Sequence, residues 1–204
     1  PIQIAGDWRS INQASSPGMT SIYATKVDGT LWGWGSNSQG QLGQNSINTP
    51  GNTGLSSPVQ IPGTTWTKVV SGSTSSDSTL LATKTDGTLW MNGYNHKGQL
   101  GQNNRTYYSS PVQIPGTTWP TSGEEKVRSV IGPGAIKTDG TLWMWGYNSN
   151  GQLGQNNRTD RSSPVQVPGT TWANIGPQGA IKTDGTLWMW GYNANGQLGQ
   201  NNIT

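Results

Sequence analysis

The residue types that most often perform catalysis are scarce in this chain. It contains nine Asp and Glu residues, a single histidine and no cysteine. The chain therefore lacks the residues for a disulfide and for a zinc site. It also lacks the usual set of a nucleophile, a base and a group that orients the base. We therefore expect a protein that is not an enzyme and that holds no cofactor and no metal.

The acidic residues and the histidine have structural interpretations. Asp followed by Gly is a strong β-hairpin signal, because both residues tolerate the backbone angles of a tight turn. Glu124 and Glu125 are adjacent, but neighbouring residues on a strand point to opposite faces, so they do not form a catalytic pair. His96 occupies a variable position and is interpreted as a surface loop side chain. The Asp-Gly turn residues are Asp28, Asp86, Asp139 and Asp184.

The elements that position these residues follow an internal repeat. Four segments align without gaps, at residues 26–45, 84–103, 137–156 and 182–201. A second phrase of the type Pro-Val-Gln-Ile begins at Pro1, Pro58, Pro111 and Pro164. We expect one domain over residues 1–204, divided into units 1–57, 58–110, 111–163 and 164–204. The last unit has eight fewer residues between its first Trp and the following Lys, where inner strands are expected.

Each unit reads as short strands separated by turns. The chain has 30 Gly, 12 Pro and only 30% hydrophobic residues, while 11 Trp supply much of the bulky apolar area. A unit of about four strands cannot cover both of its faces, whereas copies packed around an axis can. The sequence therefore predicts an all-β protein of the β-propeller type; a β-solenoid is the competing arrangement, but its coils are usually shorter.

The repeated phrase resembles a known family. DGTLWMWGYNxxGQLGQN, followed by a strand that starts with Pro, is similar to the repeat of the regulator of chromosome condensation family. The resemblance implies that the Pro-x-Gln-x strand is the outer strand of the blade already begun. Two departures are the presence of four units where founding members have seven blades, and the absence of the His that commonly follows the inner-strand Gly. The near-identical, polar units look most like bacterial or bacteriophage members.

The strands expected at the two ends of the chain bear on whether the blades close into a ring. By the assignment that the resemblance implies, the last unit lacks an outer strand, and Pro1-Ile2-Gln3-Ile4 is a spare one. We expect these residues to pair with residues 186–192 of this chain or of another copy. The alternatives are a four-bladed ring closed by the N-terminal strand and a part of a larger or oligomeric ring.

Tryptophans spaced by two share one sheet face in three units. They are Trp32 with Trp34, Trp143 with Trp145, and Trp188 with Trp190. Such a face can stack on sugars, but a chain without Phe also needs these rings to fill the space between blades. We expect Trp143, Trp145, Trp188 and Trp190 to be mostly buried.

Binding residues are expected where near-identical units differ. The segments NRTYYSS and NRTDRSS combine aromatic and guanidinium groups, which are enriched at protein contacts. The candidate partner-binding residues are Arg105, Tyr107, Tyr108, Arg158 and Arg161.

These observations lead to a non-enzymatic structural or interaction module. We expect an extracellular or virion-associated propeller, of the tail-fibre or adhesin kind, that binds a protein or a cell-surface glycan, or other subunits of a larger assembly. One alternative is a guanine-nucleotide exchange and chromatin-binding regulator, as in the founding family member; another is a lectin-like glycan binder. No apolar run is long enough to insert in a membrane. The net charge of +3 is spread along the chain and is weak evidence for nucleic acid.

Overall fold

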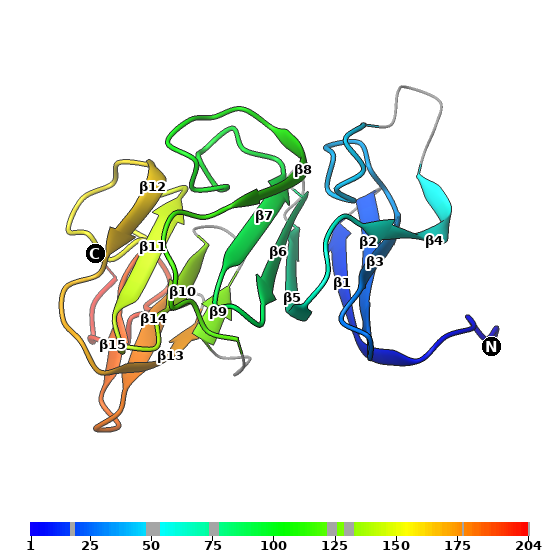
Figure 1. Cartoon of the computed structure of the whole chain (residues 1–204). Coiled ribbons are helices and arrows are strands. Elements are labelled where there is room, and N and C mark those ends of the chain that lie inside the picture. Colours follow the sequence, from blue (N-terminus) through cyan, green and yellow to red (C-terminus); the bar gives the residue numbers. More distant parts are fainter. Residues whose placement is uncertain are drawn as a thin grey trace.

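A computed structural model describes residues 1–16, 19–47, 54–73, 78–121, 126–128, 133–176 and 178–203. Its regular elements are β-strands, arranged in four separate antiparallel sheets that follow one another along the chain (Figure 1). We call these sheets the first to fourth blades. The predicted all-β fold is confirmed, with four strands in each of the first three blades and three in the fourth.

The strands of each blade lie in chain order. The first blade contains β1 (Trp8–Ser16), β2 (Met19–Lys26), β3 (Leu31–Gly35) and β4 (Leu55–Ile61). The second contains β5 (Trp66–Ser73), β6 (Ser78–Lys84), β7 (Leu89–Gly93) and β8 (Tyr108–Gln113). The third contains β9 (Val127–Arg128), β10 (Gly134–Ile136), β11 (Leu142–Gly146) and β12 (Arg161–Gln166). The fourth contains β13 (Trp172–Gly176), β14 (Gly179–Lys182) and β15 (Leu187–Met189).

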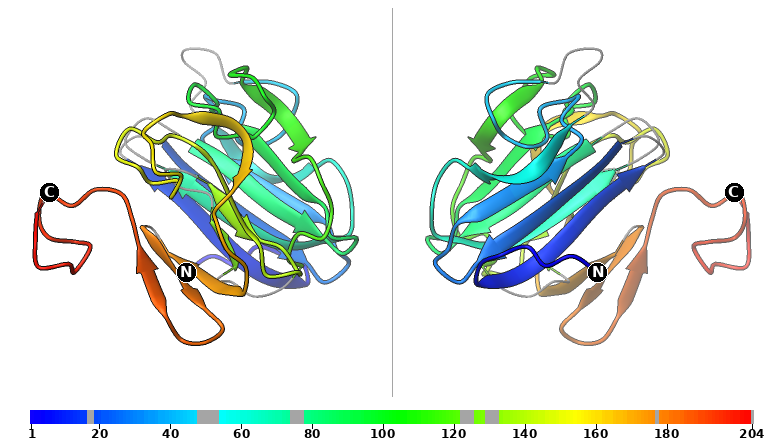
Figure 2. Two further views of the ribbon diagram at one scale, coloured as in Figure 1. Left: turned by 90° about the vertical axis from the view of Figure 1, so that its left-hand side faces the viewer. Right: turned by 90° about the vertical axis from the view of Figure 1, so that its right-hand side faces the viewer.

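The blades do not close into a ring within this chain. Residues 1–5 form no strand, and the two termini lie at opposite sides of the molecule in Figure 1 and apart from each other in both views of Figure 2. The expected pairing of residues 1–4 with residues 186–192 is therefore not made inside one chain. The physical reason is that the four blades follow one another in a row, with the first and the fourth at opposite ends, so residues 1–4 lie too far from β15 to pair with it (Figure 1).

The Asp-Gly turns have the structural role that the sequence predicts. The Asp28 carboxylate accepts hydrogen bonds from the backbone N–H of Thr30, at 2.9 Å, and from its hydroxyl, at 2.7 Å. The Trp32 indole N–H in turn donates to the Thr30 hydroxyl at 2.8 Å. The hydrogen bonds from threonine lower the pKa of the aspartate in all four blades. The same relay joins Asp86, Thr88 and Trp90; Asp139, Thr141 and Trp143; and Asp184, Thr186 and Trp188.

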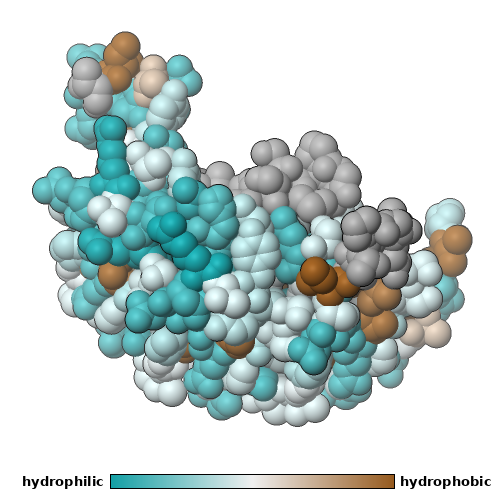
Figure 3. All heavy atoms as spheres, turned by 90° about the horizontal axis from the view of Figure 1, so that it is seen from above, coloured by the Kyte–Doolittle hydropathy of each residue, from teal (hydrophilic) through white to brown (hydrophobic). Residues whose placement is uncertain are grey.

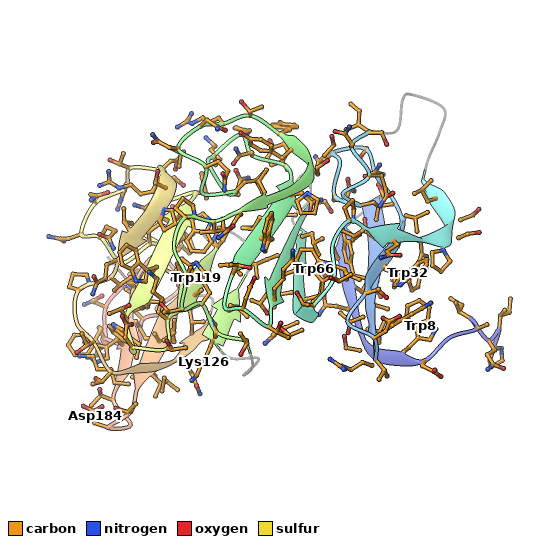
Figure 4. All side chains as sticks on the ribbon, in the orientation of Figure 1. Trp8, Trp32, Trp66, Trp119, Lys126 and Asp184 are labelled. Carbon is orange, nitrogen blue, oxygen red and sulfur yellow. The ribbon has the colours of Figure 1, made fainter. Side chains whose placement is uncertain are left out.

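A lysine lies between two tryptophans in every blade. In the first blade the Lys26 Nζ is 5.0 Å from the ring centroid of Trp8 and 4.2 Å from that of Trp32. Trp8 and Trp32 approach each other from β1 and β3 in Figure 4, whereas Asp184 marks the tip of the fourth hairpin. The aromatic faces attract the ammonium, and the aliphatic stem packs between the rings. The equivalent lysines are Lys84, Lys137 and Lys182.

Neighbouring blades are joined by backbone hydrogen bonds at the hairpin turns. The Trp66 N–H donates to the Gly29 carbonyl at 2.9 Å, and Trp119 and Trp172 repeat this bond to the turns of the second and third blades. Gly29 has a φ of 82°, and a Cβ there would lie 3.3 Å from the Thr65 backbone nitrogen. Glycine is therefore needed both for the turn and for the close approach of the next blade.

The hydrophobic core is divided into three clusters, each between two successive blades. Of the four tryptophans expected in this core, Trp145 is fully buried, Trp143 and Trp190 are half-buried, and Trp188 is 51% exposed. The Trp145 indole donates to the Gln99 carbonyl of the preceding blade at 2.8 Å, and Trp190 does the same to Gln152. The expectation is thus wrong for Trp188. Its equivalents Trp32, Trp90 and Trp143 pair with a glutamine of an outer strand, whereas no described residue pairs with the outer edge of β15.

We expect the lysine between two rings to stabilise its blade. Lys84→Met keeps the aliphatic stem but removes the charge, and should lower the free energy of unfolding by about 1 kcal/mol because two cation–π contacts are lost. The measurement is urea denaturation, with Lys126→Met as the control, since no ring contact is described for Lys126 (Figure 4). Equal midpoints for the two variants would show that the ammonium contributes nothing.

The lowered aspartate pKa values predict a dependence of stability on pH. A carboxyl whose pKa is lower in the folded state stabilises the fold above the ordinary value of 3.8, and this stabilisation is lost as pH falls from 3.8 through the folded pKa. Replacing Asp28, Asp86, Asp139 and Asp184 together by Asn should flatten the acid side of the stability profile. The measurement is the melting temperature as a function of pH below about pH 5, roughly one unit above the ordinary carboxyl pKa. If the melting temperatures of parent and variant fall equally as the pH falls, the expectation is contradicted.

Candidate functional site

The loops that join β7 to β8 and β11 to β12 are held by buried asparagines. Asn95 accepts a hydrogen bond from the Leu100 backbone N–H at 2.8 Å and donates to the Thr106 carbonyl at 2.7 Å. In the third blade Asn148 makes the same bonds to Leu153 and Thr159. These internal bonds tie both ends of each loop to one side chain. The two loops are therefore rigid supports for the side chains that differ between units.

The two loops lie at the upper side of Figure 1, and we call residues 94–107, with Tyr147, Asn148 and Asp160 of the second loop, the loop face. Seen from above in Figure 3, this part of the molecule presents a largely hydrophilic surface. The loop face crosses the junction between the second and third blades. It is the place in the described chain where charged side chains of two blades meet.

Aromatic side chains of the second blade form one end of the loop face. The rings of Tyr94 and Tyr107 have centroids 4.9 Å apart, and those of Tyr94 and His96 are 5.4 Å apart. The Tyr94 hydroxyl is 2.6 Å from the His96 Nδ1. Tyr107 is 47% exposed. The three rings thus form a cluster that remains open to solvent.

Asp160 connects the loops of the two blades. Its carboxylate is 3.7 Å from the Lys97 Nζ and 3.8 Å from an Arg105 guanidinium nitrogen, and it accepts a hydrogen bond from the Asn148 N–H at 2.8 Å. The Lys97 Nζ also lies 5.5 Å from the ring centroid of Tyr147. Two cations share one carboxylate, so the cluster carries an excess of positive charge. The Arg105 side chain is 61% exposed, which leaves its guanidinium available for a partner.

The structure separates the five residues that the sequence analysis grouped. Arg105 and Tyr107 lie on the loop face, whereas exposed Arg158 lines a pocket toward the fourth blade. Tyr108 and Arg161 are not in loops; they occupy equivalent positions at the start of β8 and β12. Tyr108 packs against the core and its hydroxyl is 3.0 Å from the Asn104 side-chain nitrogen. Arg161 is half-buried, with its Nε unpaired.

Sequence reasoning missed several members of the cluster. His96 is exposed, as interpreted, but it also bonds to Tyr94 and belongs to the aromatic group. Lys97 and Asp160 were not selected, although both stand where neighbouring units differ: Lys97 aligns with Asn150, and Asp160 with Tyr107. The exchange of a tyrosine for an aspartate between aligned loops is the signal that could have identified Asp160.

Among the residues that the structure describes, the acidic side chains of the hairpins are used within their own turns. These aspartates are exposed to solvent. Within the described ranges no group of three or more His, Cys, Asp or Glu side chains could hold a metal ion. Glu124 and Glu125 lie outside the described residues. The described part of the chain also contains no helix that is long and apolar enough to span a membrane.

Comparison with known proteins identifies the repeat. The family model described as the regulator of chromosome condensation (RCC1) repeat matches residues 28–81 and 139–173. The RCC2 homolog of Danio rerio is 37% identical over 123 residues, which are 58% of this chain and 22% of that protein. The X-linked retinitis pigmentosa GTPase regulator of Canis lupus familiaris is 32% identical over 141 residues, 67% of this chain and 13% of that protein. The chain thus spans only a minor part of these relatives.

Solved structures support the propeller fold. Human WBSCR16 superimposes with a TM-score of 0.71 at 21% identity, over 100% of this chain and 52% of that one. Prp20p of Saccharomyces cerevisiae superimposes with a TM-score of 0.63 at 16% identity, over 80% of this chain and 39% of that one. At such identities the likeness concerns the fold alone. It confirms the predicted β-propeller architecture of RCC-type repeats.

The comparisons also correct the expected location. These relatives are eukaryotic proteins, and one of them is named as a GTPase regulator, so the expectation of an extracellular or virion-associated protein is wrong. They give no support for a bacterial or bacteriophage origin or for a tail-fibre or adhesion role. The polar composition of the near-identical units does not indicate a bacterial or bacteriophage origin, because it follows from the repeated turns and the asparagine-held loops of the fold itself. The chain thus has the fold of RCC-type β-propellers, and two parts of it, residues 28–81 and 139–173, match the regulator of chromosome condensation (RCC1) repeat.

Proposed function

We propose that the chain is a protein-binding propeller of the regulatory type, and that its loop face contacts an acidic surface of a GTPase-class partner. The observation that carries this proposal is the cluster at the junction of the second and third blades. It combines exposed Arg105 and Tyr107 with His96 and Lys97 on one rigid loop of the second blade. Asp160 of the neighbouring loop lies against the two cations. Tyr and Arg are the residues that most often dominate the binding free energy of protein contacts.

The names of the relatives favour a GTPase over other partners. One relative is a GTPase regulator, and the Prp20p structure was described with its binding to Gsp1p and to histones. A histone is basic and would meet charge of the same sign at the loop face. A glycan has less support, because the tryptophans that could stack on sugars mostly hold lysines or fill the space between blades. A GTPase with an acidic patch fits both the charge and the aromatic groups.

The loop face predicts a specific loss of binding. Arg105→Ala combined with Tyr107→Ala should weaken binding of a small GTPase by about 2 kcal/mol, roughly thirtyfold in Kd, because an interface arginine and tyrosine are removed. The melting temperature should stay near that of the parent, since exposed substitutions cost less than about 0.5 kcal/mol each. Calorimetric titration of the GTPase measures the affinity.

Arg158→Ala provides the matched control, because this arginine is exposed but lies on the far side of the third-blade loop. It should bind like the parent. A parallel assay follows the release of fluorescent GDP from the GTPase; binding without faster release would assign a recruiting role instead of nucleotide exchange. If the double variant and the control bind equally well, the loop face is not the contact surface.

A further inference from the structure

One buried position differs between units that are otherwise nearly identical. The second residue after the strand tryptophan is Trp34, Trp145 or Trp190 in three units, but Asn92 in the second unit. Asn92 is 1% exposed, so the exchange changes the interior of the protein. It lies where the second blade packs against the first, and these two blades stand side by side in Figure 1.

The asparagine keeps the hydrogen bond that the tryptophans make. At the next two junctions an indole N–H donates to a glutamine carbonyl of the preceding blade at 2.8 Å. The aligned carbonyl at the first junction belongs to Gln41. The Asn92 side-chain nitrogen donates to it at 2.9 Å, and to the neighbouring Gly40 carbonyl at 2.9 Å. The second blade thus docks on the first through the same carbonyl, but without the ring.

A tyrosine of the first blade bonds to this carbonyl as well. The Tyr23 hydroxyl donates to the Gln41 carbonyl at 3.0 Å, and Tyr23 is 0% exposed. Burial raises the pKa of this phenol, so the hydroxyl stays protonated and can donate. A carbonyl oxygen has two lone pairs, which Tyr23 and Asn92 share between them. An indole in place of Asn92 would compete with Tyr23 for the same oxygen.

The residue opposite Tyr23 makes room for the tyrosine ring. Tyr23 on β2 pairs with Gly33 on β3, and a Cβ on Gly33 would lie 3.2 Å from the Tyr23 Cδ1. At the two junctions where a tryptophan docks, a different pair stands at this place. The pairs there are Leu81 with Met91 and Gly134 with Met144. Tyrosine, glycine and asparagine therefore replace the residues of the other junctions as a set.

Asn92 is not the residue that stability alone would select. Its Oδ1 is buried and has no hydrogen-bond partner among the residues that the structure describes. A buried acceptor without a partner destabilises a fold, and a tryptophan would bury more apolar surface. A buried polar side chain that persists in spite of this is best attested as a device that specifies one pairing over another.

Such a device matters because the blades are nearly identical. All four units share the turn glycine, the docked tryptophan and the lysine, so the contacts of one junction could also form with a wrong blade. Misassembly between similar units is a characteristic failure of repeat proteins. A residue that differs at the junction is what can distinguish the right blade from a wrong one.

We propose that Tyr23, Gly33 and Asn92 make the first blade a selective docking surface whose partner is the second blade. The surface accepts a blade that offers an amide donor at this place. It excludes the third and fourth blades, because their indole rings would meet the Tyr23 ring at the Gln41 carbonyl. The set thereby fixes which of the near-identical blades packs against the first.

The first experiment exchanges the set between junctions and measures the melting temperature of the full chain. Asn92→Trp alone should lower the melting temperature by about 5 °C or more, because the ring is forced against Tyr23. Tyr23→Gly with Gly33→Met copies the pair of the third blade and should also lower it, because a cavity is left beside Asn92. The three substitutions together should restore most of the loss, since they rebuild the contact between the third and fourth blades.

The decisive quantity is the sign of the Asn92→Trp effect in the two backgrounds. It should be destabilising in the parent and stabilising beside Gly and Met; the same sign in both would show that the three residues do not act as a set. If the single variant does not fold, recovery in the triple variant supports the proposal and a triple variant that stays unfolded contradicts it.

Trp145→Asn is the matched control at the second junction. It should lower the melting temperature, because Leu81 and Met91 leave the space of the lost ring unfilled. A tolerated Trp145→Asn would mean that another junction accepts asparagine equally well, which contradicts the selectivity of the first.

The second experiment tests which blade docks during folding. The parent and the triple variant are unfolded in urea and refolded by dilution to submicromolar concentration, which suppresses contact between chains. Tryptophan fluorescence follows the kinetics, and gel filtration measures the native fraction. The triple variant, whose first blade now fits any blade with a tryptophan at this place, should show an added slow phase and a smaller native fraction than the parent. Equal refolding of two equally stable proteins would overturn the proposal.

Discussion

Every blade of this protein depends on its neighbour to bury its apolar face. The three hydrophobic clusters lie between blades and none lies within one sheet, since a single sheet has no second layer of its own. Leu31 is completely buried because the second blade covers it, whereas its equivalent Leu187 is exposed because no described residue packs over it. The stability of a blade is therefore largely a property of the contact between blades, as in other repeat proteins.

This constraint explains why the repeated phrase is strict. Gly29 accepts the Trp66 N–H and leaves room for Thr65, so one residue serves both the turn and the docking of the next blade. The tryptophan docked there also forms one side of the lysine sandwich. A substitution at any of these positions would disturb a turn, a blade contact and an aromatic cluster together. The turn glycine, the docked tryptophan and the lysine are accordingly the same in all four units.

Much of the fold could be predicted from the sequence because it is repeated. The Asp-Gly hairpins and the strand composition follow from local patterns, whereas the assignment of the Pro-x-Gln-x phrase to the preceding blade followed from the family resemblance. The lysine sandwiches could not be predicted, because Lys84 and Trp66 lie 18 residues apart and meet only across paired strands. For the site, loop variation correctly drew attention to Arg105 and Tyr107, but Tyr108 and Arg161 turned out to begin strands. Asp160 could not be foreseen as a bridge, since its two cations belong to another blade.

Burial between blades also separates the two kinds of surface in this protein. The inner faces of the blades are apolar and hold neighbouring blades together through the three hydrophobic clusters. The loop face is polar and rests on loops that are held by their own asparagines. A substitution between blades should therefore change stability, whereas a substitution of an exposed side chain on the loop face should leave the propeller intact.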